Sequence, residues 1–384
     1  YTMSGAPSTL SISSGTISGT PINANVGTHT IVVTATDGSN AAVSDTFVLT
    51  VTNTNDAPTV ANAIADASTA EDASYSVSVS NVFTDVDTGD SCTYSMSGAP
   101  STITLSGTTI SGTPVNANVG THTIVVTCTD GSSAAVSDSY VLTVTNTNDA
   151  PTVTSAIADA STAEDASYSL NAAAAFTDVD SGDTLTYTMS GAPSTLSISS
   201  GTISGTPINA NVGTHTIVVT ATDGSNAAVS DTFVLTVTNT NDAPTVTSAI
   251  ADASTAEDAA YSISISSVFT DVDSGDSCTY SMSGAPSTIT LSGTTISGTP
   301  VNANVGTHTI VVTCTDGSSA AVSDSYVLTV TNTNDAPTVT SAIADASTAE
   351  DASYSLNAAA AFTDVDSGDS LTYTMSGAPS TLSI

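Results

Sequence analysis

The sequence predicts an all-β protein, a tandem array of two-sheet β-sandwiches of about 93 residues each, and three observations predict it. The string Asn-Asp-Ala-Pro begins at Asn55, Asn148, Asn241 and Asn334, with a constant spacing of 93 residues. Short runs rich in Val, Ile and Thr alternate with turn signals, and no stretch has the apolar period of a long helix. Finally, 39 % of the residues are hydrophobic and only 9 % are charged, which argues for a folded chain.

The 93-residue period divides the chain into five segments. Three complete repeats are expected at 58–150, 151–243 and 244–336, with the C-terminal part of a repeat at 1–57 and the N-terminal part of another at 337–384. Because the first 12 residues recur as the last 12, we expect the chain to be a window of a longer array.

Two repeat types alternate along this array. The first and third complete repeats contain the cysteines Cys92, Cys128, Cys278 and Cys314, and the repeat between them has Leu185 and Ala221 at the equivalent positions. The alternation of the two repeat types therefore has a period of 186 residues, twice the basic period of 93 residues.

Within the repeat 151–243, turn residues separate seven short strand candidates. They are Thr152–Ile157, Ser167–Ala173, Leu185–Ser190, Thr195–Ser199, Thr202–Ser204, Thr214–Thr222 and Asp231–Thr238. Alternation of apolar and hydroxyl side chains in the sixth candidate indicates one buried and one exposed face. Seven short strands in this length are typical of a seven-stranded sandwich of the immunoglobulin-like kind.

The charge of the chain excludes several functions. There are 36 Asp and Glu residues and no Lys or Arg, so the formal net charge is −36. A nucleic acid or an anionic membrane would repel such a surface, whose natural partner is a cation. No apolar run approaches the roughly 20 residues that span a bilayer, so we expect no membrane insertion in this part of the protein.

The residues of an enzyme site are not grouped in this sequence. No Gly-x-Ser-x-Gly elbow and no phosphate-binding loop is present, and an aromatic content of 4 % argues against a glycosidase cleft. The four histidines, His29, His122, His215 and His308, recur in the strand Gly-Thr-His-Thr-Ile-Val-Val, where a structural role is expected. We therefore expect no enzyme.

Four motifs recur in fixed order in every repeat. In the middle repeat they are Asn148-Asp149-Ala150-Pro151, Glu164-Asp165, the turn Asp178-Val179-Asp180-Ser181-Gly182-Asp183, and Thr222-Asp223-Gly224. With these motifs the repeats resemble cadherin-like domains of the dystroglycan-type and bacterial surface-adhesin branches. The resemblance covers the whole chain and implies calcium ions at the junctions between repeats, which stiffen the array.

The resemblance assigns calcium ligands to each junction. At the first junction they are Asn53, Asn55, Asp56, Asp85, Asp87 and Asp130. At the second they are Glu71, Asn146, Asn148, Asp149, Asp178, Asp180 and Asp223. At the third they are Glu164, Asn239, Asn241, Asp242, Asp271, Asp273 and Asp316. At the fourth they are Glu257, Asn332, Asn334, Asp335, Asp364 and Asp366.

The chemistry of these residues agrees with calcium, which prefers carboxylate and carbonyl oxygens. The alternative is that the acids only form turns and carry solvated charge. Asn replaces an acid at the start of the linker, and Asn209-Ala210-Asn211 replaces the acidic Asp-Arg-Glu step of cadherins, so we expect one or two ions per junction rather than three. We interpret Asp159, Asp165 and Asp231 as solvated charges.

The cysteines form candidate pairs within a repeat. In an immunoglobulin-like strand order the third and sixth strands are neighbours, which predicts disulfides Cys92–Cys128 and Cys278–Cys314 in an exported protein. Buried free thiols are the alternative.

The leading functional hypothesis is the structural repeat region of a long extracellular filament or giant surface adhesin, stiffened by calcium and serving cohesion or attachment. The alternative is an extracellular recognition module for a glycan or a partner domain; ice binding by the hydroxyl-rich strands is a third hypothesis. Expected partners are calcium ions and, by self-association or lateral bundling, like chains.

Overall fold

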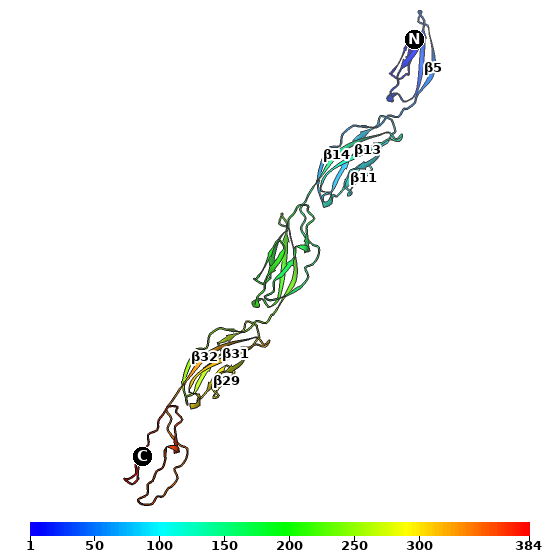
Figure 1. Cartoon of the computed structure of the whole chain (residues 1–384). Coiled ribbons are helices and arrows are strands. Elements are labelled where there is room, and N and C mark those ends of the chain that lie inside the picture. Colours follow the sequence, from blue (N-terminus) through cyan, green and yellow to red (C-terminus); the bar gives the residue numbers. More distant parts are fainter. The chain divides into compact units, whose positions relative to one another are not determined.

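A computed structural model describes all of residues 1–384. The chain is all-β, and its only helical segments are single 3-10 turns of three residues. Figure 1 shows a similar group of strands recurring in the three middle segments, whereas the C-terminal segment is drawn mostly as loops. The predicted tandem array of β-sandwiches is confirmed, whereas the segment boundaries stay a prediction.

The repeat 58–150 contains two main sheets. Their strand orders are β10-β13-β14-β7 and β11-β12-β8, and β6 pairs separately with β9. The elements are β6 (Thr59–Val60), β7 (Ala67–Ala70), β8 (Tyr75–Ser78), β9 (Phe83–Thr84), β10 (Thr93–Ser97), β11 (Ile103–Ser106), β12 (Thr109–Gly112), η2 (Asn116–Asn118), β13 (Gly120–Thr129) and β14 (Ala135–Thr145).

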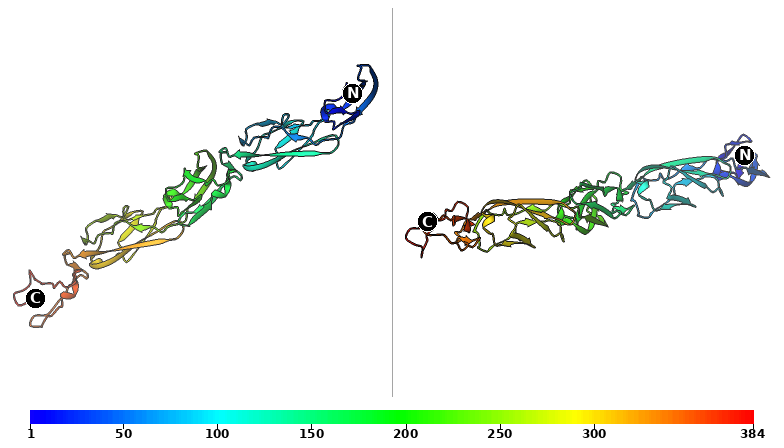
Figure 2. Two further views of the ribbon diagram at one scale, coloured as in Figure 1. Left: turned by 90° about the horizontal axis from the view of Figure 1, so that it is seen from above. Right: turned by 60° about the horizontal axis from the view of Figure 1, so that its bottom comes forward.

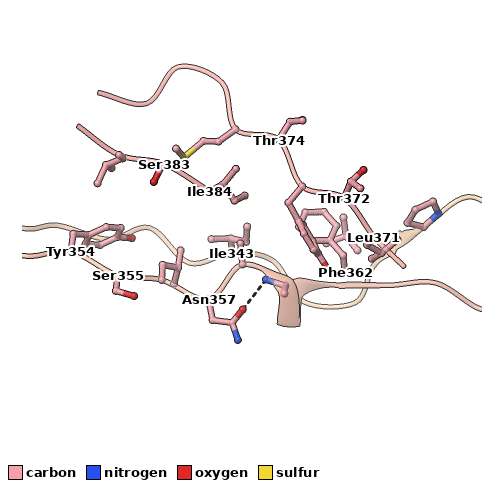
Figure 3. Close-up of a pocket in the computed structure, with 18 residues that line it drawn as sticks. Ile343, Tyr354, Ser355, Asn357, Phe362, Leu371, Thr372, Thr374, Ser383 and Ile384 are labelled. Carbon is pink, nitrogen blue, oxygen red and sulfur yellow. Dashed lines mark hydrogen bonds between the residues drawn. The ribbon is translucent and has the colours of Figure 1, made fainter. Parts of the chain in front are cut away.

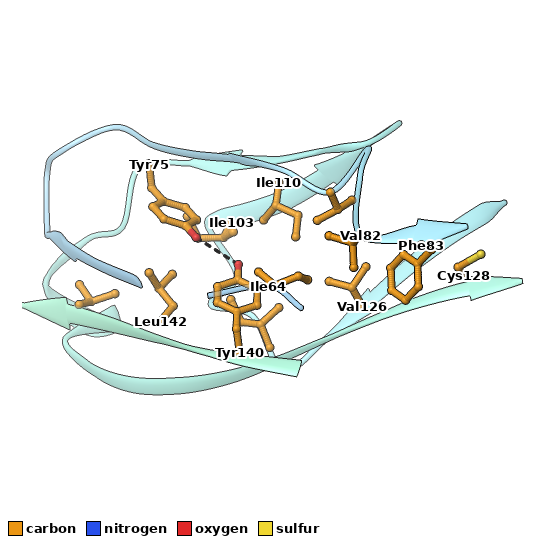
Figure 4. Packing of buried hydrophobic residues seen from close by; sticks show 13 residues of the cluster. Ile64, Tyr75, Val82, Phe83, Ile103, Ile110, Val126, Cys128, Tyr140 and Leu142 are labelled. Carbon is orange, nitrogen blue, oxygen red and sulfur yellow. Dashed lines mark hydrogen bonds between the residues drawn. The ribbon is translucent and has the colours of Figure 1, made fainter. Parts of the chain in front are cut away.

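The core of this repeat lies between the two sheets (Figure 4). Every second residue of β13 from Ile124 onward is buried, and the residues between them are more exposed, as the period of a strand requires. Ile110 of β12 and Leu142 of β14 are fully buried against the same cluster. The long β13–β14 hairpin and its counterpart β31–β32 are the longest arrows of their repeats (Figure 2).

The other segments contain corresponding elements. The repeat 151–243 has β15 (Thr152–Val153), β16 (Ala160–Ala163), β17 (Tyr168–Asn171), η3 (Ala173–Ala175), β18 (Phe176–Thr177), β19 (Thr186–Ser190), β20 (Leu196–Ser199), β21 (Thr202–Gly205), η4 (Asn209–Asn211), β22 (Gly213–Thr222) and β23 (Ala228–Thr238). The repeat 244–336 has β24 (Thr245–Val246), β25 (Ala253–Ala256), β26 (Tyr261–Ser264), β27 (Phe269–Thr270), β28 (Thr279–Ser283), β29 (Ile289–Ser292), β30 (Thr295–Gly298), η5 (Asn302–Asn304), β31 (Gly306–Thr315) and β32 (Ala321–Thr331). The N-terminal segment has β1 (Thr2–Ser4), β2 (Leu10–Ser13), β3 (Thr16–Gly19), η1 (Asn23–Asn25), β4 (Gly27–Thr36) and β5 (Ala42–Val51), and the C-terminal one has β33 (Thr338–Val339), η6 (Ala359–Ala361) and β34 (Phe362–Thr363).

The first predicted strand differs from the observed one. Instead of one strand over Thr152–Ile157, the chain forms the two-residue β15, which pairs with β18, and then β16, which pairs in parallel with β23. The edge segment thus changes its pairing partner. The sequence of β16, Ala-Ser-Thr-Ala, has no large apolar residue, so its alternation gave no strand signal.

Carboxylates hold this edge segment in place. In the repeat 58–150, Asp66 Oδ1 accepts a hydrogen bond from Val141 N at 2.7 Å, and Asp138 Oδ2 accepts one from Ile64 N at 2.6 Å. In the next repeat Asp159 accepts one from Val234 N at 2.7 Å. Asp159 is exposed, so its interpretation as a solvated charge stays a prediction, and its carboxylate also accepts a hydrogen bond from the backbone of β23.

Each cysteine-containing repeat has one disulfide. Cys92 precedes β10, and Cys128 lies on the neighbouring strand β13, with a Cα–Cα distance of 5.2 Å. Cys278 and Cys314 pair in the same way, and no cysteine is free. The predicted pairing follows from the adjacency of the two strands.

Candidate metal centre

Carboxylates collect where the repeats 58–150 and 151–243 meet. We call Glu71, Asp149 and Asp180 the inner cluster. The outer cluster consists of Asp178, Asp183 and Asp223. In each cluster every residue contributes a carboxylate oxygen, and these oxygens lie within 4.8 Å of one another. The inner cluster joins the preceding repeat, the linker and the following repeat.

Glu71 is positioned by the end of the edge strand β7. Its backbone N–H donates to Thr145 O at 3.0 Å, which continues the parallel pairing with β14. The next residue, Asp72, has φ 56°, a left-handed conformation that Asp tolerates better than most residues. The chain therefore turns directly after Glu71, whose side chain points inward with 2 % of its surface exposed.

One oxygen of Glu71 has no hydrogen-bond partner. Oε1 accepts a bond from Thr147 N at 2.9 Å, whereas the buried Oε2 is unpaired. A buried carboxylate oxygen without a donor is costly, since no protein group replaces its lost hydration. An unpaired oxygen at this place is the feature expected of a ligand for a cation.

The turn from Asp178 to Asp183 presents three carboxylates. Asp180 N donates to Asp178 Oδ1 at 2.9 Å, and Asp183 N donates to Asp180 O at 3.3 Å. Gly182 has φ 103°, a conformation that side chains disfavour, so this turn requires its glycine. Asp178 Oδ2 is buried without a partner, the second such oxygen at this junction.

Both carboxylate oxygens of Asp180 accept hydrogen bonds. Oδ2 accepts a hydrogen bond from Asp149 N in the linker at 2.7 Å. Oδ1 accepts one from Asn116 Nδ2 at 2.8 Å, which comes from the 3-10 turn η2 of the preceding repeat. Asp180 is thus bound to the preceding repeat and to the linker through neutral groups.

The outer cluster contains two acids with opposite pKa shifts. The side-chain hydrogen bond from Asn148, at 2.8 Å, lowers the pKa of Asp223, and backbone N–H donors of its turn act in the same direction. For Asp183, burial and then repulsion from Asp178, Asp180 and Asp223 raise the pKa. Neighbouring negative charges therefore make the ionised form of the exposed Asp183 less favourable than that of an isolated aspartate.

The donor set of both clusters fits a hard divalent cation such as calcium. All the converging groups are carboxylates, and two of their buried oxygens are unpaired. The chain has no Lys or Arg that could neutralise them. Calcium binds six to eight oxygen ligands of this kind.

The same arrangement recurs at the other junctions. The inner clusters there are Glu164, Asp242 and Asp273 at the third junction and Glu257, Asp335 and Asp366 at the fourth. The buried glutamates of both have an unpaired Oε2. At the first junction, Asp85, Asp87 and Asp90 form a cluster, and Asn55 Nδ2 donates to Asp130 at 2.9 Å.

The structure brings most of the predicted ligands together. The three glutamates and the second aspartate of each Asp-x-Asp turn lie in the clusters, and Asn148 contacts Asp223 as a hydrogen-bond donor. The first asparagines of the linkers are exposed, and their role stays a prediction; they are Asn53, Asn146, Asn239 and Asn332.

Two kinds of site residue were missed by the sequence analysis. One is the acid that ends the turn, found at Asp90 and Asp183, which lies in a cluster although it was not assigned as a ligand. Its signal was present, because the acid closes the recurring Asp-x-Asp-x-Gly-Asp motif. The other is Asn116, which sequence alone could not connect to Asp180, 64 residues away.

An apolar groove in residues 337–384 is a second candidate site (Figure 3). Its walls include Val339, Ile343 and Phe362. The equivalent residues of the repeat 244–336 pack in the core cluster with residues of β31 and β32. The groove is therefore lined by residues of the core type, and these residue types indicate no ligand.

A family model described as "Putative Ig domain" matches residues 1–52, 57–145, 150–238 and 243–331. The chain belongs to this Ig domain family. The matched Ig domains cover most of the chain and follow the 93-residue period, which confirms the predicted tandem immunoglobulin-like repeats.

Among curated proteins, these Ig domains are similar to a serine-rich adhesin for platelets of Staphylococcus aureus strain MRSA252. The two are 40 % identical over 153 residues, which is 38 % of this chain and 11 % of the adhesin. The chain thus spans about a tenth of that relative's length, and only 6 % of the version from strain MW2.

Among solved structures, the Ig domains are similar to mouse cadherin-23 EC22-24, with 19 % identity and a TM-score of 0.46 over 73 % of this chain and 100 % of that one. An endo-fucoidan hydrolase from glycoside hydrolase family 107 matches with 22 % identity and a TM-score of 0.27 over 73 % of this chain and 45 % of that one. No helix in the structure has the length and apolar character needed to cross a membrane.

Proposed function

We propose that the chain is a structural repeat region of a long extracellular filament or surface adhesin, that calcium stiffens its junctions, and that it serves cohesion or attachment. Near-identical Ig domains in tandem suit a spacer that repeats one element many times. The similarity to a surface adhesin supports the same role and a cell-surface location.

The observation that carries the proposal is the unpaired Oε2 of a glutamate that is almost fully buried, at 1–2 % exposure, at three successive junctions. In each case two aspartates place oxygens within 4.8 Å of the glutamate carboxylate. A chain of net charge −36 without Lys or Arg gains most from a cation at such a place.

The residues of the inner cluster explain how a bound cation would stiffen the chain. Glu71 belongs to one repeat, Asp149 to the linker and Asp180 to the next repeat. Carboxylates from all three segments would hold the same ion, so that rotation of the linker would break ligand contacts. Calcium supplies the positive charge that these acids share.

The test is a calcium titration of the full chain by calorimetry, followed by thermal unfolding in calcium and in chelator. One variant carries Glu71→Gln, Glu164→Gln and Glu257→Gln. The matched control carries Asp72→Asn, Asp165→Asn and Asp258→Asn, which remove the same number of charges from exposed neighbouring residues. Asn tolerates the left-handed conformation of these aspartates.

Calcium at a hundred times its Kd is expected to stabilise the wild type by about 3 kcal/mol per site. The control is expected to bind calcium nearly as well, because it loses charges near the clusters, such as Asp258 beside Asp335, but no cluster residue. The glutamine variant is expected to bind at least about tenfold more weakly, because it loses a charged ligand from each of three clusters. A wild type that neither binds calcium nor melts at a higher temperature in its presence would refute the proposal.

We also propose that like chains associate laterally when divalent cations reduce their charge. Copies with a net charge of −36 repel one another, and cations bound at the junctions lower that repulsion. Sedimentation velocity should show larger species in calcium than in chelator at equal ionic strength. Equal sedimentation in both would contradict self-association.

A further inference from the structure

The 3-10 turn η2 (Asn116–Asn118) is held rigidly at the end of its repeat. Asn118 is buried, and its Oδ1 accepts hydrogen bonds from Val115 N at 3.1 Å and from Thr102 Oγ1 at 2.9 Å. Its backbone oxygen accepts a bond from His122 Nε2 at 2.7 Å. These contacts fix the backbone of the turn, so the side chain of Asn116 is presented from a rigid support.

Asn116 projects from this turn to the next repeat. Its Nδ2 donates to Asp180 Oδ1 at 2.8 Å. Asn209 donates to Asp273 at 2.7 Å, and Asn302 donates to Asp366 at 3.0 Å. An asparagine amide thus contacts an inner-cluster carboxylate at three successive junctions, each time across 64 residues.

The corresponding amide of the first junction also contacts carboxylates of the next repeat and its linker. Asn23 Nδ2 donates to Asp56 Oδ2 at 2.6 Å and to Asp87 Oδ1 at 3.4 Å. In a chain without Lys or Arg, this NH2 group supplies partial positive charge to the inner cluster.

A carboxamide has a donor end and an acceptor end of nearly the same shape. A half-turn about the Cβ–Cγ bond of Asn116 exchanges its NH2 group with its carbonyl oxygen. A divalent cation repels the NH2 end and attracts the oxygen, since amide oxygens are among the ligands of calcium. The unpaired Oε2 of Glu71 independently marks the inner cluster as a cation site.

We infer that the side-chain amide of the first asparagine in each Asn-Ala-Asn turn has two orientations. A cation in the inner cluster determines which orientation it takes, and each orientation restrains the junction in a different way. Without a cation its NH2 holds Asp180 and keeps the repeats connected. With a cation the amide reverses, and its Oδ1 becomes a ligand of the cation in the inner cluster. The second half of this inference rests on the proposed calcium function; the first half does not.

The reversal has a consequence for affinity. A cation must break the Asn116–Asp180 hydrogen bond before it gains the amide oxygen. The cost of breaking this bond reduces the net free energy of cation binding. A carboxylate at position 116 would bind the cation more tightly but would repel Asp180 in its absence. The amide therefore raises the calcium concentration at which the junction changes state, while it limits loosening below that concentration.

Two full-chain variants and one control test the inference. The first variant replaces Asn23, Asn116, Asn209 and Asn302 by Ala, and the second replaces the same residues by Asp. The control replaces four exposed strand threonines by Ser, namely Thr30, Thr123, Thr216 and Thr309. Calorimetry measures calcium affinity, and hydrogen exchange in chelator measures protection of the linker amides, such as Asp149 N, that donate to the same carboxylates.

In chelator, both variants are expected to exchange these linker amides about tenfold faster than the wild type, because Asp180 and its equivalents lose a restraint. In calcium, the Ala variant is expected to bind about tenfold more weakly, and the Asp variant about tenfold more tightly. The control should match the wild type in both measurements.

Unchanged exchange of the Ala variant in chelator would overturn the donor half of the inference. Unchanged or tighter calcium binding by the Ala variant would overturn the ligand half. A wild type that binds no calcium would refute the proposed function and the ligand half together, while the chelator experiment would still decide the donor half.

Discussion

The repeats 58–150 and 151–243 have the same strands but different interiors. The first closes a disulfide between Cys92 and Cys128, where the second has Leu185 and Ala221. Their shared junction nevertheless has the same kind of inner cluster as the third and fourth junctions. The two repeat types therefore differ in the core, while the junctions that follow them have the same inner cluster.

The tyrosine pairs extend this difference. In the cysteine-containing repeat, Tyr75 Oη donates to Tyr140 Oη at 3.3 Å inside the core (Figure 4). In the other repeat Phe233 occupies the position of Tyr140, and the buried hydroxyl of Tyr168 has no partner. The repeat without a disulfide therefore also lacks a core hydrogen bond. Both differences are expected to make the cysteine-containing repeat the more stable of the two.

The largest predicted effect comes from the disulfides. Converting both cysteine repeats to the other type, with Cys92→Leu and Cys278→Leu together with Cys128→Ala and Cys314→Ala, opens two loops of 36 residues. We expect each converted repeat to lose about 3 to 4 kcal/mol, because the unfolded chain regains the entropy of an open loop. Calorimetric unfolding should change from separate transitions to transitions close to that of the repeat 151–243.

A reductant provides the control for this prediction. It should lower the transitions of the two cysteine repeats in the wild type and leave the converted variant unchanged. A converted variant that melts as the oxidised wild type does would mean that packing of Leu and Ala replaces the covalent bond completely.

A smaller effect is expected from the tyrosine pair. Tyr140→Phe with Tyr326→Phe would leave the buried hydroxyls of Tyr75 and Tyr261 unpaired, at a cost of about 1 kcal/mol per repeat. The reverse change, Phe233→Tyr, would give Tyr168 a partner and stabilise its repeat by up to about 1 kcal/mol. Denaturant unfolding of the full chain would measure both; loss of stability in the Phe233→Tyr variant would show that the core has no room for the added oxygen.

The sequence predicted what depends on local pattern and on the repeat. The sandwich, the 93-residue period and the Cys92–Cys128 pairing followed from alternation, turn residues and the expected neighbours of two strands. The short strand β16 was missed because its Ala-Ser-Thr-Ala sequence does not alternate in polarity, and tertiary pairing with β23 determines it.

The candidate site was predictable to a similar extent. Glu71 and the Asp-x-Asp turn lie in conspicuous motifs, and the structure gathers them. The contact of Asn116 with Asp180 depends on how a turn of one repeat meets the next, and no local pattern encodes it. The edge contact of Asp66 with Val141 N is likewise a product of strand pairing.

The smallest predicted effect is the pH dependence, which should be alike in the two repeat types because it arises at the junctions. Hydrogen bonds from Asn55, Asn148 and Asn241 lower the pKa of Asp130, Asp223 and Asp316, respectively. A carboxyl group whose pKa is lower in the folded state stabilises the fold above its unfolded pKa, and this contribution is lost as the pH falls below about 4.

Asp183 and Asp276 should act in the opposite direction. Burial, and then repulsion from neighbouring aspartates, raise the pKa of both, so the folded chain binds their protons more readily than the unfolded chain does. In chelator, stability should therefore rise slightly as the pH falls from neutral toward about 4, before the loss caused by Asp223 and its equivalents begins. Calcium would replace the missing positive charge and abolish the rise while the loss remains. Melting temperatures between pH 7 and about pH 3, with and without calcium, would measure this; a rise of equal size in both conditions would mean that the carboxylates around Asp183 do not share a cation.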